Sequence, residues 1–359
     1  MWWILFSELV RYVWTRNYPD FVVRVSERLM RQNLVYTKIF QGIVAKHAPC
    51  EMAHNIPYPP DEVAPTLTDG LTVGEVIGTG MVAVVFAGTA GGRPAVIKVK
   101  RKNIGLKLAA GLRDVGRTLA FVSRLPWVRQ FSLLEVFEEV RDMILVQIDF
   151  EQEARNQKRF RAMFAYNPRI VVPELFEEWC TSDQLVMERL YGGPVEDCPD
   201  AAALLSQVIV KSVVLDGFVH ADMHIGNVFF MKRGLGIVDY GLMTELTREQ
   251  QESYITFSKF LMNEAYDEAA AYTLDTYFTR TAHRPDLVPK ISAIFRSMKR
   301  RNVLGVHELA EVARVAYPRK MFPFLKKQVL YIGAADALHQ MLSPNSLDLL
   351  LKNVVAFTE

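Results

Sequence analysis

His220-Ala221-Asp222-Met223-His224-Ile225-Gly226-Asn227, followed after two short apolar runs by Asp239-Tyr240-Gly241, is the stretch of sequence that decides the fold. Transfer of a phosphoryl group needs an aspartate that orients or deprotonates the attacking hydroxyl, and an asparagine and a second aspartate that hold the metal ion on the phosphates. Asp222, Asn227 and Asp239 have this order and spacing, and the apolar runs predict two strands that return Asp239 to Asn227. Each residue alone could be a helix cap or a turn residue. Together they predict catalysis by Asp222 and metal binding by Asn227 and Asp239.

A β-rich region lies far upstream, where residues 71–100 follow the pattern strand, turn, strand, turn, strand. Ala95-Val96-Ile97-Lys98 resembles the strand that carries the phosphate-binding lysine of kinases. A lysine on a buried strand needs a partner, whereas a lysine on an edge strand would face water. Glycines between the first two strands would let backbone N–H groups approach phosphates, although a plain hairpin also explains them. The residues expected to contact the nucleotide are Gly78, Gly80, Ala83, Lys98 and Glu188.

The acidic partner of Lys98 is expected on a helix in the same lobe, and the stretch from Gln147 to Asn156 is the candidate. Asp149 and Glu153 are four residues apart, so they would share one face of that helix. A solvated acidic face explains either residue alone. In combination with the strand lysine, the pattern predicts an ion pair between Lys98 and Glu153 in which both residues serve catalysis.

These elements divide the chain into three regions. Residues 1–65 have a helical pattern and end in the proline-rich stretch Ile56–Pro60, which indicates a linker because proline lacks the N–H that a helix needs. Residues 71–190 hold the strands and the acidic helix, and residues 191–359 are mainly helical. The predicted fold class is α+β, a bilobal protein-kinase-like fold with a small β-sheet lobe, a mainly helical large lobe and an N-terminal helical extension.

Over about residues 33–245 these motifs resemble those of the UbiB (AarF-type) family of atypical kinases. That family reads Glu-x-Asp-Phe/Tyr-x-x-Glu-Ala in the acidic helix, where this chain has Gln147 in place of the first glutamate. It reads His-x-Asp-x-His-Pro-Gly-Asn in the catalytic loop, where this chain has Ile225 in place of proline. Its extension carries Lys-x-Gly-Gln after an aromatic residue, and Lys38-Ile39-Phe40-Gln41 fits with phenylalanine in place of glycine. The family's nucleotide loop is usually alanine-rich, whereas this one bears glycine.

The resemblance implies an ATP and Mg²⁺ site formed by the ion pair of Lys98 and Glu153 and by the metal ligands Asn227 and Asp239. It also implies that Lys38 and Gln41 reach over the nucleotide pocket together with Asp149, as a lid. Gln147 cannot offer Lys38 the full charge of the family's glutamate, and Phe40 hinders the closest backbone approach. We therefore expect the lid to open more readily than in the relatives. By resemblance, the family supports ubiquinone and other isoprenoid-lipid pathways at membranes.

The sequence after Asp239-Tyr240-Gly241 bears on the substrate. Thr244 to Glu249 has the pattern of a capped helix start, and no Ala-Pro-Glu tripeptide follows, so the peptide platform of ordinary protein kinases is not expected. A small molecule, a lipid or bare ATP hydrolysis suits the sequence better than a peptide. Two alternatives stay open: a small-molecule phosphotransferase of the aminoglycoside or choline kinase type, and a nucleotide-binding scaffold without turnover.

Composition bounds the remaining possibilities. The net charge is +2 without a Lys/Arg block, so no nucleic-acid partner is expected. Three cysteines without a Cys-x-x-Cys pair predict a reducing intracellular compartment. His47, Cys50 and His54 lack a fourth ligand for structural zinc, and His224 is expected to orient its neighbours by hydrogen bonds. No apolar run is long enough to span a membrane, but residues 1–16 carry three tryptophans and predict either an interfacial membrane helix or a helix docked on its own protein.

Overall fold

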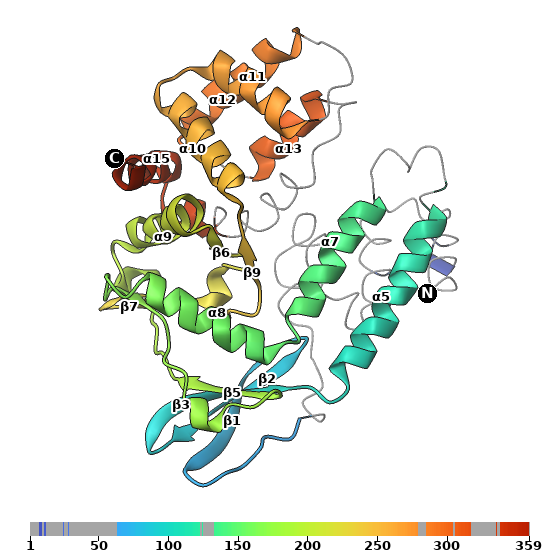
Figure 1. Cartoon of the computed structure of the whole chain (residues 1–359), viewed down its shortest axis with the longest axis vertical. Helices are drawn as coiled ribbons and strands as arrows, with labels where there is room; N and C mark the ends of the chain where they lie inside the picture. Colours follow the sequence, from blue (N-terminus) through green and yellow to red (C-terminus); the bar gives the residue numbers. More distant parts are fainter. Residues whose placement is uncertain are drawn as a thin grey trace. The chain divides into compact units, whose positions relative to one another are not determined.

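The computed structural model describes residues 63–122, 124, 133–278, 285–303, 306–316, 335 and 338–358, and the isolated helical residues 7, 8, 11, 24 and 28. The chain divides into two compact units, which contain the elements labelled in Figure 1. The first unit comprises Met1–Glu151 and Leu175–Glu188, and the second comprises Gln152–Glu174 and Arg189–Glu359.

The first unit is built on a four-stranded antiparallel sheet in the order β1-β2-β3-β5. Its strands are β1 (Leu71–Thr79), β2 (Ala83–Ala90), β3 (Arg93–Lys100) and β5 (Gln184–Glu188), and the short 3₁₀-helix η1 (Glu177–Trp179) precedes β5. Along β3 the side chains of Ala95, Ile97 and Val99 are buried, while Val96 and Lys98 between them are half-buried. Because successive side chains of a strand point to opposite faces, this alternation places Lys98 on the face opposite to the core.

Two helices of the first unit, α5 (Ile104–Val122) and α7 (Leu133–Val146), run side by side (Figure 1). Ile104, Leu108 and Leu112 of α5 are buried at a spacing of one turn, as an amphipathic helix requires. A Cβ on Gly116 of α5 would lie 3.0 Å from Cε1 of Phe137 on α7. Glycine therefore allows the ring of Phe137 to pack directly against the backbone of α5.

The second unit contains two small sheets that hold the predicted catalytic loop. The strands β4 (Ile170–Val171), β8 (Gly234–Ile237) and β7 (Val228–Met231) form one sheet in that order, and β6 (Phe218–His220) pairs with β9 (Met243–Glu245) in the other. Helix α8 (Phe150–Met163) lies mostly in this unit. Helix α9 (Ala201–Val210) continues through the π-helix Lys211–Asp216 to Gly217, whose φ of 59° ends the helix and directs the chain into β6. Two 3₁₀-helices, η2 (Val195–Asp197) and η4 (Ile225–Asn227), complete this part.

The C-terminal part of the second unit is helical. Its helices are α10 (Arg248–Met262), α11 (Tyr266–Tyr277), α12 (Leu287–Arg301), α13 (Val306–Ala316) and α15 (Ser346–Thr358). Thr247 and Gln250 form a capping box that starts α10, in which each side chain accepts a hydrogen bond from the other residue's backbone N–H. Buried residues including Phe257, Ile291 and Phe295 form one apolar core among these helices, and α15 packs on α9.

The predicted α+β kinase-like class is confirmed, because an antiparallel sheet comes first and a mostly helical region follows. The domain boundaries at 65, 71 and 190 stay a prediction. Of residues 1–16, only three are described, and one of them, Glu8, is buried and pairs with Arg28 at 2.6 Å. Among the residues that the structure describes, no helix is both long and apolar enough to cross a membrane. Lys38 and Gln41, and the three potential zinc ligands at 47, 50 and 54, lie outside the described residues.

Candidate active site

Lys98 lies at the centre of the sheet in the first unit. β3 pairs with β2 on one side and with β5 on the other, and Lys98 is opposite Val85 and Leu185 in these pairs. The Nζ atom of Lys98 lies 5.5 Å from the ring centroid of Phe150, the first residue of α8, which is a favourable cation–π distance. Glu188, the last residue of β5, is half-buried in the same sheet. The alternative of an edge-strand lysine is therefore excluded.

The glycines between β1 and β2 have different positions. Gly78 lies within β1, while the N–H of Gly80 donates to the carbonyl of Ala83 at 2.8 Å and closes the turn. The Nε atom of Arg101 donates to the carbonyl of Gly80 at 3.0 Å and holds the turn in place. A Cβ on Gly78 or Gly80 would approach its neighbours no closer than 3.5 Å. This backbone would thus also accept the alanine that the UbiB-type loop carries.

Helix α8 lies against the loop of Asp239 within the second unit. Glu153 is 1% exposed, and its Oε2 lies 3.3 Å from the position that a Cβ on Gly241 would take. On the same helix, Nδ2 of Asn156 donates to the backbone carbonyl of Tyr240 at 3.0 Å. The amide of Asn156 is oriented by Gln152, whose Nε2 donates to Oδ1 of Asn156 at 2.8 Å. An acid and an amide of α8 therefore meet the same short loop.

His220, at the end of β6, joins the two loops of the site. The backbone N–H of Asp222 donates to Nδ1 of His220 at 3.3 Å, and Nε2 of His220 lies 3.3 Å from the carbonyl of Val238. Because Nδ1 accepts a hydrogen bond, the ring proton is on Nε2 and is donated to Val238. Burial lowers the pKa of His220 below its ordinary value of 6.5, so the imidazole is neutral at pH 7.

Asp222 and Asn227 are tied together inside the loop. The Nδ2 atom of Asn227 donates to the backbone carbonyl of Asp222 at 2.9 Å. The backbone N–H of Gly226 donates to Nδ1 of His224 at 3.0 Å, and the other ring nitrogen, Nε2, lies 3.4 Å from Nδ2 of Asn227. The same Nε2 lies 4.0 Å from Oδ2 of Asp222. The ring of His224 thus lies between the side chains of Asp222 and Asn227.

Asp239 is brought to Asn227 by the hairpin of β7 and β8. The two strands pair antiparallel, and the N–H of Val238 donates to the carbonyl of Asn227 at 3.0 Å. Asp239 has a φ of 62°, in the left-handed region that aspartate enters more readily than most residues. Its Oδ1 accepts a hydrogen bond from the N–H of Gly241 at 3.3 Å. Tyr240, between them, is fully buried, and burial raises the pKa of its phenol well above the ordinary value.

The donor atoms of this hairpin suit Mg²⁺. Because Nδ2 of Asn227 is bonded to the carbonyl of Asp222, the amide oxygen Oδ1 is the atom left for a cation. Asp239 supplies a carboxylate. Mg²⁺ prefers oxygen ligands and is commonly held by one or two carboxylates together with substrate phosphates. The two residues predicted as metal ligands therefore fit the ion chemically.

Gln147 and Asp149 lie just before α8 rather than within it. The structure thus differs from the expectation that Asp149 and Glu153 share one helix face. The reason is local, because aspartate is favoured at the residue before a helix, where its charge complements the helix N-terminus. The lid formed with Lys38 and Gln41 stays a prediction, as does the ion pair between the lysine of β3 and the glutamate of α8.

Two residues of the predicted motifs were given no role by sequence reasoning. Asn156 and His220 both bond to backbone near Asp239, at positions far from themselves in the chain. A weak signal was available for Asn156, because it is a polar residue on the helix that carries Glu153. Nothing in the local sequence indicated which carbonyl group it would reach.

The antiparallel sheet with its central lysine strand and the mostly helical unit with its two short sheets define a protein-kinase-like fold. A family model described as ABC1 atypical kinase-like domain matches residues 75–273, which is more than half of the chain. The chain belongs to the ABC1 atypical kinase-like family.

Sequence matches to bacterial proteins agree with this family assignment. A protein of Aeromonas salmonicida (strain A449) named "Probable protein kinase UbiB" is 36% identical over 187 residues, covering 46% of this chain and 34% of that protein. A protein of Cronobacter sakazakii (strain ATCC BAA-894) with the same name is 32% identical over 206 residues, covering 52% of this chain and 37% of that protein. The matched part thus spans about a third of the length of these relatives.

A solved structure supports the fold. The complex structure of Rv3197–erythromycin from Mycobacterium tuberculosis resembles this chain with a TM-score of 0.52 and 14% sequence identity. The likeness covers 92% of this chain and 87% of that one. At this identity it shows a shared fold.

Proposed function

We propose that this chain binds ATP with Mg²⁺ and transfers or hydrolyses the γ-phosphate, acting on a small molecule or a lipid, or in support of isoprenoid-quinone lipid metabolism. The observation that carries the proposal is the β7–β8 hairpin. Its backbone pairing sets Asp239 next to Asn227 along the hairpin, and Nδ2 of Asn227 bonds to the carbonyl of Asp222. This arrangement supports a role for Asp222 as base and for Asn227 and Asp239 as metal ligands.

Each side chain has a distinct task in this proposal. Asp222 accepts a hydrogen bond from the attacking hydroxyl or water and receives its proton as the new bond to phosphorus forms. His220 and Asn227 hold the backbone of Asp222 in place, so the carboxylate loses little freedom when substrate binds. Lys98 would neutralise phosphate charge, and the predicted ion pair with Glu153 would keep the ammonium group in position.

Mg²⁺ bound to Asn227 and Asp239 would supply positive charge at the phosphate oxygens. The left-handed backbone at Asp239 and the hydrogen bond from Gly241 orient this carboxylate before the nucleotide arrives. Preorganised groups of this kind need no rearrangement during the reaction, which is how they lower its barrier.

The short segment after Gly241 supports a substrate that is not a peptide. β9 follows directly and pairs with β6, and the capping box at Thr247 then starts α10. This arrangement leaves no room for the long activation segment on which protein kinases bind a peptide. We also propose that residues 1–16 contact a membrane surface and that the protein works in a reducing intracellular compartment.

The test is nucleotide turnover by the purified full chain, with and without isoprenoid-quinone-like lipids. We expect Mg²⁺-dependent ATP turnover that Asp239→Asn abolishes, together with loss of thermal stabilisation by Mg²⁺ and ADP in that variant. Stabilisation by nucleotide without any turnover would instead indicate a scaffold. Phosphorylation of an amino alcohol or aminoglycoside would indicate the small-molecule phosphotransferase. Unchanged stabilisation in Asp239→Asn would refute the metal assignment.

A further inference from the structure

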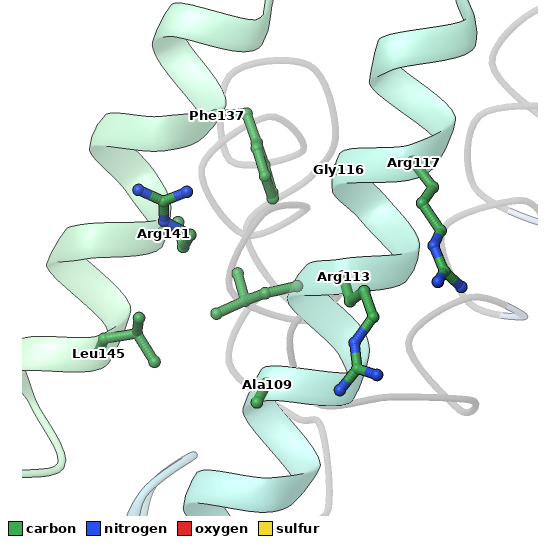
Figure 2. A pocket seen from close by; sticks show the side chains of 8 residues that line it. Ala109, Arg113, Gly116, Arg117, Phe137, Arg141 and Leu145 are labelled. Carbon is green, nitrogen blue, oxygen red and sulfur yellow. The ribbon is translucent and has the colours of Figure 1, made fainter.

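A cavity of 380 Å³ lies between α5 and α7 in the first unit (Figure 2). This volume is within the range of small-molecule sites. Figure 2 shows the side chains of Phe137 and Leu145 between the two helices, and Leu112 lines the cavity from α5. The floor of the cavity is therefore apolar. None of the residues assigned above to nucleotide, metal or catalysis lines it.

Three arginines are among the residues that line the cavity, Arg113 and Arg117 from α5 and Arg141 from α7. In Figure 2 the side chains of Arg113 and Arg117 extend along the side of α5 that is turned away from α7. Arg113 and Arg117 are exposed, and within the described part of the chain neither makes a hydrogen bond or an ion pair. Arg141 pairs with its neighbour Asp142 at 3.0 Å, an acid that does not line the cavity. Arg113 and Arg117 lie one helical turn apart, where like charges repel. A bound anion would relieve this repulsion.

The apolar part of the cavity is formed without a ligand. Gly116 brings the ring of Phe137 against the backbone of α5, so the ring forms a wall and does not fill the space beside it. Leu106 and Phe121 lie on the same stripe of α5 as the arginines and are 74% and 56% exposed. Large apolar side chains thus flank the two free cations along the helix.

We propose that this cavity binds an amphiphile with a single hydrocarbon chain and an anionic head, either phosphate or carboxylate. The head binds Arg113 and Arg117, whose exposed side chains can turn toward the cavity mouth and whose planar guanidinium groups can form paired hydrogen bonds with either anion. The chain covers Leu112, Phe137 and Leu145, which removes apolar surface from water. This binding site is independent of the function proposed above.

The experiment measures binding to the full chain by calorimetry, with dodecyl phosphate, dodecanoate, dodecanol and inorganic phosphate as probes. The two anionic amphiphiles are kept below their micelle concentrations, and dodecanol is kept below its solubility limit. We expect both anionic amphiphiles to bind, and dodecanol and inorganic phosphate to bind at least about tenfold more weakly, since each lacks one half of the ligand. Arg113→Gln with Arg117→Gln should weaken the anionic amphiphiles about tenfold and leave dodecanol unchanged. Ala109→Phe, at an exposed lining position, should fill the cavity and weaken all three chain-bearing probes.

The matched control is Arg161→Gln with Arg300→Gln, which removes the same charge from exposed positions on other helices. It should bind every probe as the unchanged chain does. The proposal is overturned if both double variants lose the same affinity, since that would show a general charge effect. Binding that Ala109→Phe leaves intact also overturns it, as does binding seen only with anionic vesicles, which would indicate a membrane surface.

Discussion

Asn156 holds the loop that carries the candidate metal ligand Asp239, and Asn156→Ala tests how much that loop depends on helix α8. The bond from Nδ2 of Asn156 to the carbonyl of Tyr240 is buried and 3.0 Å long. Its loss leaves a buried carbonyl without this donor, which costs about 1–3 kcal/mol of unfolding free energy. The left-handed backbone of Asp239 costs about 1–2 kcal/mol by itself. Without the bond from Asn156, the loop would therefore lower its free energy by leaving this backbone conformation.

The expected effect on binding follows from these magnitudes. If relaxation is favoured by about 1.4 kcal/mol, only about one loop in ten stays competent, and the apparent dissociation constant of ADP with Mg²⁺ rises about tenfold. The affinity for ADP without Mg²⁺ should change far less, because Lys98, the predicted phosphate-binding lysine, is on β3 and not on the loop of Asp239. Calorimetric titration with and without Mg²⁺ measures this difference, and denaturant unfolding measures the loss of stability.

Gln157→Ala is the matched control. Gln157 follows Asn156 on the same helix, is 1% exposed, and donates from Nε2 to the carbonyl of Pro173 at 2.9 Å. It should lose a similar amount of stability, about 1–3 kcal/mol, without loss of Mg²⁺-dependent affinity. If both variants weaken Mg²⁺ and ADP equally, or if neither does, Asn156 has no specific part in positioning Asp239 and only stabilises the fold.

Three further predictions concern pH, glycine and the lid. The pKa of His220 is lowered in the folded protein, so the unfolded chain binds more protons around and below pH 6.5, and the free energy of unfolding should fall as the pH drops through that value. His220→Gln should reduce the slope of the unfolding free energy against pH, measured by denaturant unfolding at several pH values. An unchanged slope would contradict this assignment. Gly217→Ala should lower the melting temperature clearly, because φ is 59° and a Cβ would meet a backbone oxygen at 2.9 Å, whereas Gly80→Ala should not. Gln147→Glu should increase hydrogen-exchange protection of residues 33–46 and slow nucleotide release, because it restores the negative charge that would pair with Lys38 of the predicted lid. If neither quantity changes, the extension is only a packing element.

The parts of the site that lie close together in sequence were predictable, and the parts that meet across the chain were not. Asp222, Asn227 and Asp239 are connected by one loop and one hairpin, so their spacing alone indicates that they converge. The central position of Lys98 depends on β5, which is remote from β3 in the chain, and a pattern of apolar residues does not reveal strand order. The bond from Asn156 depends equally on how distant segments pack.

Gly241 shows how such a distant contact shapes a local motif. Its φ is not among the positive values, so the position does not need glycine for its backbone conformation. Glycine instead leaves room for its neighbours, because a Cβ would lie 3.2 Å from Oδ1 of Asp239 and 3.3 Å from Oε2 of Glu153, and both carboxylates would have to move by a few tenths of an ångström. The two carboxylates that approach this position come from different elements, one from the loop itself and one from helix α8. The space around the third residue of Asp239-Tyr240-Gly241 is therefore limited by helix α8 as well as by the loop itself, and no pattern within the motif could have indicated the contribution of the helix.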